Sequence, residues 1–124
     1  MEKINQDWIK KGINNDAIQH SQQLAAELCS KDLTMNQLRN WYSEINRIRL
    51  QSDFDKRSAL LLLPKLHYAI ARTTKVEAAT LIKETMIEAT KLAAESADNF
   101  SNYADYMESL IAFFKFSLSS KKNN

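Results

Sequence analysis

The scarcity of glycine and proline constrains this chain more than any other feature of its sequence. Its 124 residues include one glycine and one proline, whereas the tight turns between β-strands depend on such residues. We therefore predict an all-α fold. Apolar residues that recur every three or four positions divide the chain into about five helices, which we expect to form a compact bundle.

A single helical domain spanning residues 1–124 is expected, because this length is close to the usual size of one domain. Residues 1–12 should form an arm or a short helix docked by Trp8, and residues 119–124 a frayed tail. No stretch approaches the ~18 apolar residues that span a bilayer, and the first residues lack the apolar region of a secretory signal. The lone Cys29 fits a reducing environment, so a cytoplasmic location without membrane contact is predicted.

Side chains that can cap a helix indicate where the helices begin. A first firm helix is expected over residues 14–29, and a third from near Phe54 to Arg72. Three pairs with cap spacing mark helix starts: Thr34 with Gln37, Ser52 with Asp55, and Thr74 with Glu77.

The segment LLLLPKLHYAIAR, residues 60–72, places the only proline of the chain directly after a run of four leucines. The leucines are expected to lie in the core. Pro64 lacks an N–H and its ring clashes with the preceding turn, so the third helix must kink or break there. Leu63 would be a poor residue to cap a new helix, which favours a kink.

Positive charge is concentrated in the middle of the chain. Residues 31–75 carry nine Lys or Arg against four Asp or Glu, a balance of +5, while residues 1–30 and 76–124 have balances of −1 and −2. All five arginines lie in this middle segment. Because the guanidinium group suits bidentate contacts with phosphate, this asymmetry indicates a site for a phosphate-bearing partner.

A candidate binding surface follows from the helical spacing of these charges. Lys65 and Arg72 are seven residues apart and share one helical face, with Tyr68 between them. Arg39 and Arg47 flank the apolar face of the preceding helix. If the two helices pack side by side, the four cations form a strip that matches the spacing of a nucleic-acid backbone.

A second interpretation of the same charges is structural. Lys and Arg side chains are exposed in most proteins, and these can be solvated rim groups paired with Glu44 or Asp53. On composition alone, this interpretation is favoured over a binding site.

Catalytic chemistry is not indicated by the sequence. The two histidines lack the spacing of a helical metal pair, and no Glu-x-x-His motif of di-iron bundles occurs. Cys29 has no evident histidine partner, and no glycine-rich loop can cradle a nucleotide phosphate. We therefore expect no enzyme, no metal and no cofactor.

Three segments together shift the balance between the two interpretations. They are LTMNQLRNWYSEINRI (33–48), LLLLPKLHYAIAR (60–72) and YADYMESLIAFFKF (103–116). In order and spacing they resemble the small helical subunit of type III-A CRISPR–Cas effector (Csm) complexes, over about residues 33 to 116. His67 stands where alanine is usual in that family, and Phe113-Phe114 stand where a Tyr-His pair is common.

The resemblance implies a non-catalytic, RNA-binding structural protein of antiviral defence. Members of the family form a short filament and contact the sugar–phosphate backbone of guide RNA paired with target RNA. The implied partners are these two RNAs, other Csm subunits including the backbone subunits, and neighbouring copies of the chain. The implied RNA-binding residues are Arg39, Lys65, Arg72, Arg47 and Tyr68.

Protein contacts are expected on the last helix. Phe113 and Phe116, as well as Phe114, place apolar groups on more than one of its faces, and Lys115 is a further candidate for subunit contacts. Two other function classes stay open: a helical protein-interaction adaptor without direct RNA contact, whose basic strip meets an acidic partner, and a small metalloenzyme.

Overall fold

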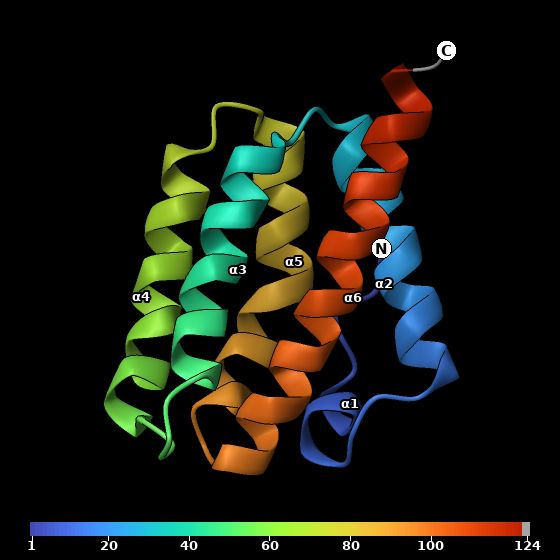
Figure 1. The fold of residues 1–124 in the computed structure, drawn as a ribbon. Coiled ribbons are helices and arrows are strands. Elements are labelled where there is room, and N and C mark those ends of the chain that lie inside the picture. The colour runs from blue at the N-terminus through green and yellow to red at the C-terminus, as the bar shows by residue number, and fades with distance from the viewer. Residues whose placement is uncertain (123–124) are drawn as a thin grey trace.

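Six helices and no strand make up residues 1–122, the part of the chain that the computed structural model describes. They are α1 (Gln6–Lys10), α2 (Asn15–Ser30), α3 (Met35–Arg49), α4 (Lys56–Arg72), α5 (Val76–Ala93) and α6 (Ala97–Lys122). Figure 1 shows the five long helices running alongside one another as a bundle. The predicted all-α bundle is confirmed, and the sixth helix is the short α1 near the N-terminus.

The end of the chain differs from the expected frayed tail. α6 continues to Lys122, so residues 119–122 are helical, and positions 123–124 of that tail lie outside the described residues. None of the helices described combines the length and the hydrophobicity that a transmembrane segment requires.

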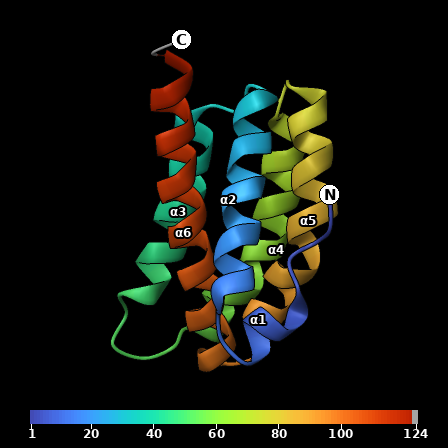
Figure 2. The same ribbon diagram turned by 90° about the vertical axis from the view of Figure 1, so that its right-hand side faces the viewer.

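The central element of the bundle is α6, which packs against α1, α2, α3 and α5. Figures 1 and 2 show it crossing the molecule from the end that holds α1 to the opposite end. α4 lies at one edge, against α5 and beside α3. Five large side chains of α6 are fully buried: Tyr103, Tyr106, Met107, Leu110 and Phe114.

Both buried tyrosines of α6 have hydrogen-bond partners for their hydroxyl groups. Tyr103 Oη lies 2.8 Å from Thr90 Oγ1, and Tyr106 Oη lies 2.7 Å from His20 Nδ1. Burial raises the pKa of both phenols, so they stay protonated and able to donate. The Trp8 ring stacks on Tyr106, with centroids 6.4 Å apart, which holds α1 against the bundle.

The cap predicted for α3 is confirmed, whereas the pair predicted for α4, Ser52 with Asp55, does not form. Gln37 N donates to Thr34 Oγ1 and Thr34 N donates to Gln37 Oε1, so the predicted capping box is confirmed. Asp55 caps α4 by accepting from Ser58 N at 3.0 Å. Ser52 lies in the preceding bend and has no part in this cap.

The cap predicted for α5 is wrong. The N-cap is Lys75 rather than Thr74, and no side chain bonds the first turn. This one-residue shift places Thr74 outside the helix and makes Glu77 the second helical residue instead of the third, so the reciprocal bonds of a capping box cannot form.

The leucine run is divided between the core and the surface. Leu62 is fully buried, whereas Leu60 and Leu61 are 54% and 47% exposed. The prediction that these leucines all lie in the core is therefore wrong. Successive residues of a helix point about 100° apart, so four in a row cannot all face the bundle.

Pro64 lies inside α4, which continues without a restart through this position. Its missing N–H leaves the carbonyl of Leu60 without a helical donor. Both residues are exposed, so water can satisfy that carbonyl. Of the two predicted outcomes, a kink or a break, the break does not occur.

Two alanine substitutions in α4 test the division of the leucine run. We expect Leu62→Ala to lower the free energy of unfolding by about 2 to 5 kcal/mol, because it opens a cavity in the core. Leu60→Ala, two residues away and exposed, should change it by less than about 0.5 kcal/mol. Urea unfolding of both variants measures the difference, and equal losses of stability would show that the assignment of the two faces is incorrect.

Candidate functional site

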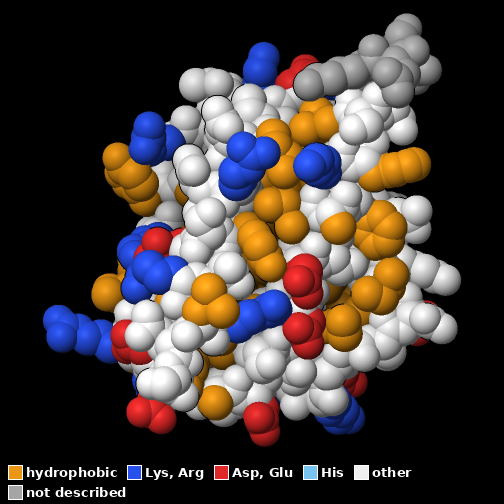
Figure 3. All heavy atoms as spheres, viewed as in Figure 1, with side chains coloured by type: hydrophobic (Ala, Val, Ile, Leu, Met, Phe, Trp, Pro, Cys, Tyr) orange, Lys and Arg blue, Asp and Glu red, His pale blue; other side chains and the backbone are white. Residues whose placement is uncertain are grey.

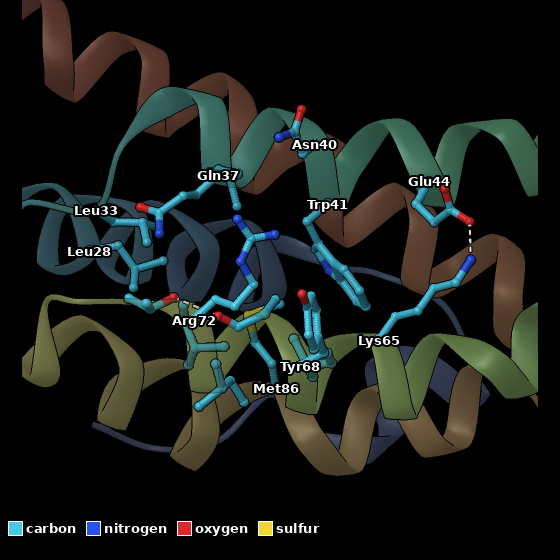
Figure 4. A pocket seen from close by; sticks show the side chains of 16 residues that line it. Leu28, Leu33, Gln37, Asn40, Trp41, Glu44, Lys65, Tyr68, Arg72 and Met86 are labelled. Atoms are coloured by element: carbon cyan, nitrogen blue, oxygen red, sulfur yellow. Dashed lines mark hydrogen bonds and ion pairs between the residues drawn. The ribbon is translucent and has the colours of Figure 1, made fainter.

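A groove of about 360 Å³ lies between α3 and α4 (Figure 4). α3 packs mainly on α6 and α4 mainly on α5, and the contact between α3 and α4 themselves is less extensive. Buried apolar side chains from five parts of the chain line its floor: Leu28, Leu33, Leu38, Leu66 and Met86. The rim is polar and comes from α3 and α4.

Two aromatic residues face each other across the groove. Trp41 projects from α3 and Tyr68 from α4, and the Tyr68 hydroxyl points towards the indole (Figure 4). Tyr68 is 65% exposed, whereas Trp41 is half-buried. Trp41 Nε1 is buried and meets no acceptor in hydrogen-bonding geometry among the described residues.

One end of the groove is basic. Arg72 extends from α4 towards Gln37 on α3 (Figure 4). Its guanidinium carbon lies 5.5 Å from the centre of the Tyr68 ring, the distance of a cation–π contact. Arg72 forms no ion pair with any side chain in the described part of the chain, so its charge is available to a ligand.

The other end of the groove is organised by Glu44. Its Oε1 accepts from Arg47 Nη2 at 2.8 Å and also from Lys65 Nζ. The hydrogen bond from Arg47, followed by that from Lys65, lowers the pKa of the Glu44 carboxyl against the opposing effect of partial burial. Lys65 thereby joins α4 to α3 at this end.

Arg47 and Lys65 pair with Glu44, as expected if the basic residues are rim groups with a structural role. Within residues 1–122, Asp53 forms no such pair. Both cations are still about half exposed, with side-chain exposures of 51% and 47%. They are shared between a carboxylate and solvent.

Arg39 lies apart from the groove. It is exposed and forms no ion pair with the described residues, but it stands two residues before Trp41 and so points about 160° away around α3. The two helices do pack side by side as assumed. The predicted strip is nevertheless divided, with Lys65, Tyr68 and Arg72 on the groove and Arg39 on the outer face of α3.

Three groove residues on α3 were not singled out as site residues in the sequence: Gln37, Asn40 and Glu44. Gln37, Trp41 and Glu44 follow helical spacing of four and three residues, which places them on one face. This spacing is a signal in the sequence from which a shared face of these three side chains can be found.

Arg49 has a structural position. Its guanidinium contacts Asp105 at 3.1 Å and Glu108 at 3.7 Å, and so connects α3 to α6. Not every arginine of the basic segment is therefore available to a ligand.

Metal-ligating side chains do not gather anywhere in residues 1–122: no three of His, Cys, Asp and Glu lie close enough to hold an ion. His20 bonds Tyr106 and the carbonyl of Glu2, and His67 Nδ1 lies 2.9 Å from the Leu63 carbonyl oxygen. Cys29 is buried.

A second hollow, of about 600 Å³, lies between α2 and the last turns of α6. Phe113 and the 62% exposed Phe116 line it together with Cys29 and Lys121. Figure 3 shows hydrophobic side chains gathered along α6 and between α6 and α3.

The paired carboxylate predicts a pH dependence of stability. The pKa of Glu44 lies below its ordinary 4.5 in the folded chain. The stability that the ionised Glu44 carboxylate contributes is therefore complete above its unfolded-state pKa. It is lost as the pH falls through the lower folded-state pKa. In Glu44→Gln, urea unfolding should show a smaller loss of stability between about pH 6 and pH 3 than in the wild type.

The matched control is Glu84→Gln, which removes an exposed glutamate of α5 that pairs with no described residue. It should keep the wild-type pH profile. A Glu44→Gln profile identical to that of the wild type would contradict the proposed coupling of Glu44 to its two cations.

Comparison with known proteins identifies the family. The family model for Csm2 Type III-A matches residues 12–120, which include α2 to α5, almost all of α6, and the groove. Neither the comparison with curated proteins nor that with solved structures finds a match. The chain belongs to the Csm2 Type III-A family, the small helical subunit of type III-A CRISPR effector complexes.

Proposed function

We propose that the α3–α4 edge of this subunit binds the sugar–phosphate backbone of guide RNA paired with target RNA, without catalysing a reaction. In this proposal the chain works as one helical domain, in the cytoplasm, in antiviral defence. Membership of the Csm2 family supports a place in the effector complex. The observation that carries RNA binding is Arg72, an arginine without a carboxylate partner among the described residues, at the mouth of a groove.

The charge of this edge favours a polyanion. Lys65 and Arg47 outweigh Glu44 by one positive charge, and Arg72 at the other end of the groove adds a second. Arg39 adds another on the outer face of α3. Such an arrangement contacts phosphates without reading bases, which is sufficient where guide pairing supplies the sequence specificity.

Pairing with Glu44 does not remove Lys65 and Arg47 from this role. Exposed ion pairs contribute about 0 to 1 kcal/mol, so exchanging a carboxylate oxygen for a phosphate oxygen is inexpensive. In the absence of RNA, Glu44 holds Lys65 at the groove and also pairs with Arg47 on α3. It also repels phosphate, so it moderates the affinity of the edge.

Protein contacts are proposed for the apolar surface of α6. Phe116 is 62% exposed, and Phe113 lies beside it in the hollow next to α2. Side chains of this size are favoured at protein interfaces. Lys115, also exposed on α6, would lie at the rim of this contact with other Csm subunits or a neighbouring copy.

A second candidate is an adaptor whose basic edge meets an acidic protein segment. The pairing of Lys65 and Arg47 with a carboxylate supports it, because the same cations can pair with carboxylates of a partner. Salt-dependent binding of purified protein to RNA separates the two candidates.

Alanine substitutions at the basic positions test phosphate contact. Arg39→Ala, Lys65→Ala and Arg72→Ala should each reduce the magnitude of the slope of log affinity against log salt by about 0.7 to 0.9. Binding of a variant that lacks one phosphate contact releases fewer counterions from the RNA. Affinity should fall similarly for unrelated RNA sequences, with little change in melting temperature. Three stable variants with wild-type affinity and salt slope would overturn the proposal.

Arg49→Ala is the matched contrast for these variants. It removes the same charge from the same segment, but it breaks the contacts of α3 with Asp105 and Glu108 on α6. It should lower the melting temperature and leave the salt slope unchanged. A changed slope would place Arg49 among the RNA contacts.

Glu44→Gln should strengthen RNA binding. Removing one negative charge about 6 Å from a bound phosphate is worth about threefold in affinity even at the dielectric constant of water. Fluorescence anisotropy with a labelled RNA duplex at low salt measures the gain, which should shrink as salt is added. Weaker binding by the variant would contradict this expectation. It would show that positioning of Lys65 and Arg47 by Glu44 favours RNA binding more than the negative charge of Glu44 opposes it.

A further inference from the structure

We infer that the α3–α4 groove holds one unpaired nucleobase, turned out of the RNA whose backbone meets the basic rim. This inference rests on the proposed function and deepens it, because it adds a base-binding pocket to a surface otherwise expected to contact phosphates alone. The groove, its aromatic residues and its cations each point to this ligand.

The dimensions of the groove suit a small planar ligand. Its volume of about 360 Å³ is near the lower end of the range of about 300 to 1,000 Å³ found for small-molecule sites. A single base fits such a space and a helix does not. The floor is apolar, with Leu66 and Met86 both buried beneath it, and therefore suits the face or edge of a base rather than a phosphate.

The aromatic residues offer surfaces on which a base can stack. Trp41 and Tyr68 approach the groove from opposite helices (Figure 4). Tyr68 is 65% exposed although it is an aromatic side chain bordering an apolar hollow. Arg72 lies over the Tyr68 ring, and guanidinium planes stack on bases as aromatic rings do.

Amide side chains can recognise the edge of the base. Gln37 and Asn40 both line the groove. The Gln37 side-chain oxygen accepts hydrogen bonds from the backbone N–H and the hydroxyl of Thr34. These bonds orient the amide group. Its NH₂ hydrogens are left to donate to a ring nitrogen or carbonyl of a base. Asn40 can donate or accept, so the pocket accommodates more than one base.

Cations flank the pocket at both ends. Lys65 and Arg72 are seven residues apart on α4, which is about 10 Å along the helix. Phosphates on the two sides of an extruded nucleotide can therefore meet one cation each. This charge complementarity favours a nucleotide over an apolar side chain of a neighbouring protein, which would leave Arg72 without an anionic partner.

The experiment compares two RNA duplexes that differ in one bulged nucleotide. The bulged position carries 2-aminopurine, whose fluorescence falls when it stacks on an aromatic ring. Binding is measured by anisotropy at low salt, where backbone contacts are strongest. Wild-type protein should bind the bulged duplex between about fivefold and a hundredfold more tightly than the perfect duplex, the range of one stacked base, and should quench the probe.

Variants assign the preference to the groove. Tyr68→Ala should reduce the ratio of the two affinities to near one and abolish quenching. Trp41→Phe, which keeps an aromatic ring in a half-buried position, should retain most of both. Leu60→Ala is the control, since it removes an exposed side chain of the same helix outside the groove, and it should retain the full ratio.

The outcomes separate this inference from the proposed function. Equal, salt-dependent affinity for both duplexes overturns the base pocket and leaves backbone binding in place. Failure to bind either duplex overturns both proposals. A bulge preference that persists in Tyr68→Ala also overturns the inference, because the base would then bind elsewhere.

Discussion

The burial of α6 among four other helices is the interaction on which the candidate site depends. Its two fully buried tyrosines form hydrogen bonds to α5 through Thr90 and to α2 through His20, and α3 also packs against it. α4 is then carried by α5 rather than by α6. Because α3 and α4 belong to different packing pairs, a groove is left between them, and its floor is the outer edge of the core itself. The site is thus a consequence of how the bundle is packed.

Charge and apolar surface are distributed on this scaffold in a way that separates two kinds of contact. The basic side chains of the α3–α4 edge suit a phosphate backbone, whereas the Phe-bearing end of α6 suits a protein. Arg49 shows that the charge of the middle segment alone does not define a ligand site, because its guanidinium is committed to two carboxylates of α6. The local partners of each cation decide which of them is available.

The sequence predicted the fold well and the site only in part. The all-α fold was predicted from the shortage of turn residues, and the start of α3 from the Thr34 capping box. Both predictions depend on local chemistry, and the structure confirms both. The pairing of Lys65 with Glu44 joins residues 21 positions apart. It depends on the distance between α3 and α4, which the periodicity of apolar residues in the sequence does not give. Arg39 was grouped with Lys65 and Arg72 by charge and resemblance, but its rotation around α3 places it on another face.

Ultraviolet cross-linking in the assembled complex tests the central claim most directly. A tagged copy of the chain is expressed in its host, irradiated, purified with its partners and digested with trypsin. We predict nucleotides attached to the peptide Leu66–Arg72, which carries Tyr68, and to Asn40–Arg47, which carries Trp41. Recovery of the complex with cross-links only on peptides of α5 or α6, or with none on this chain, would contradict an RNA-binding role for the α3–α4 edge.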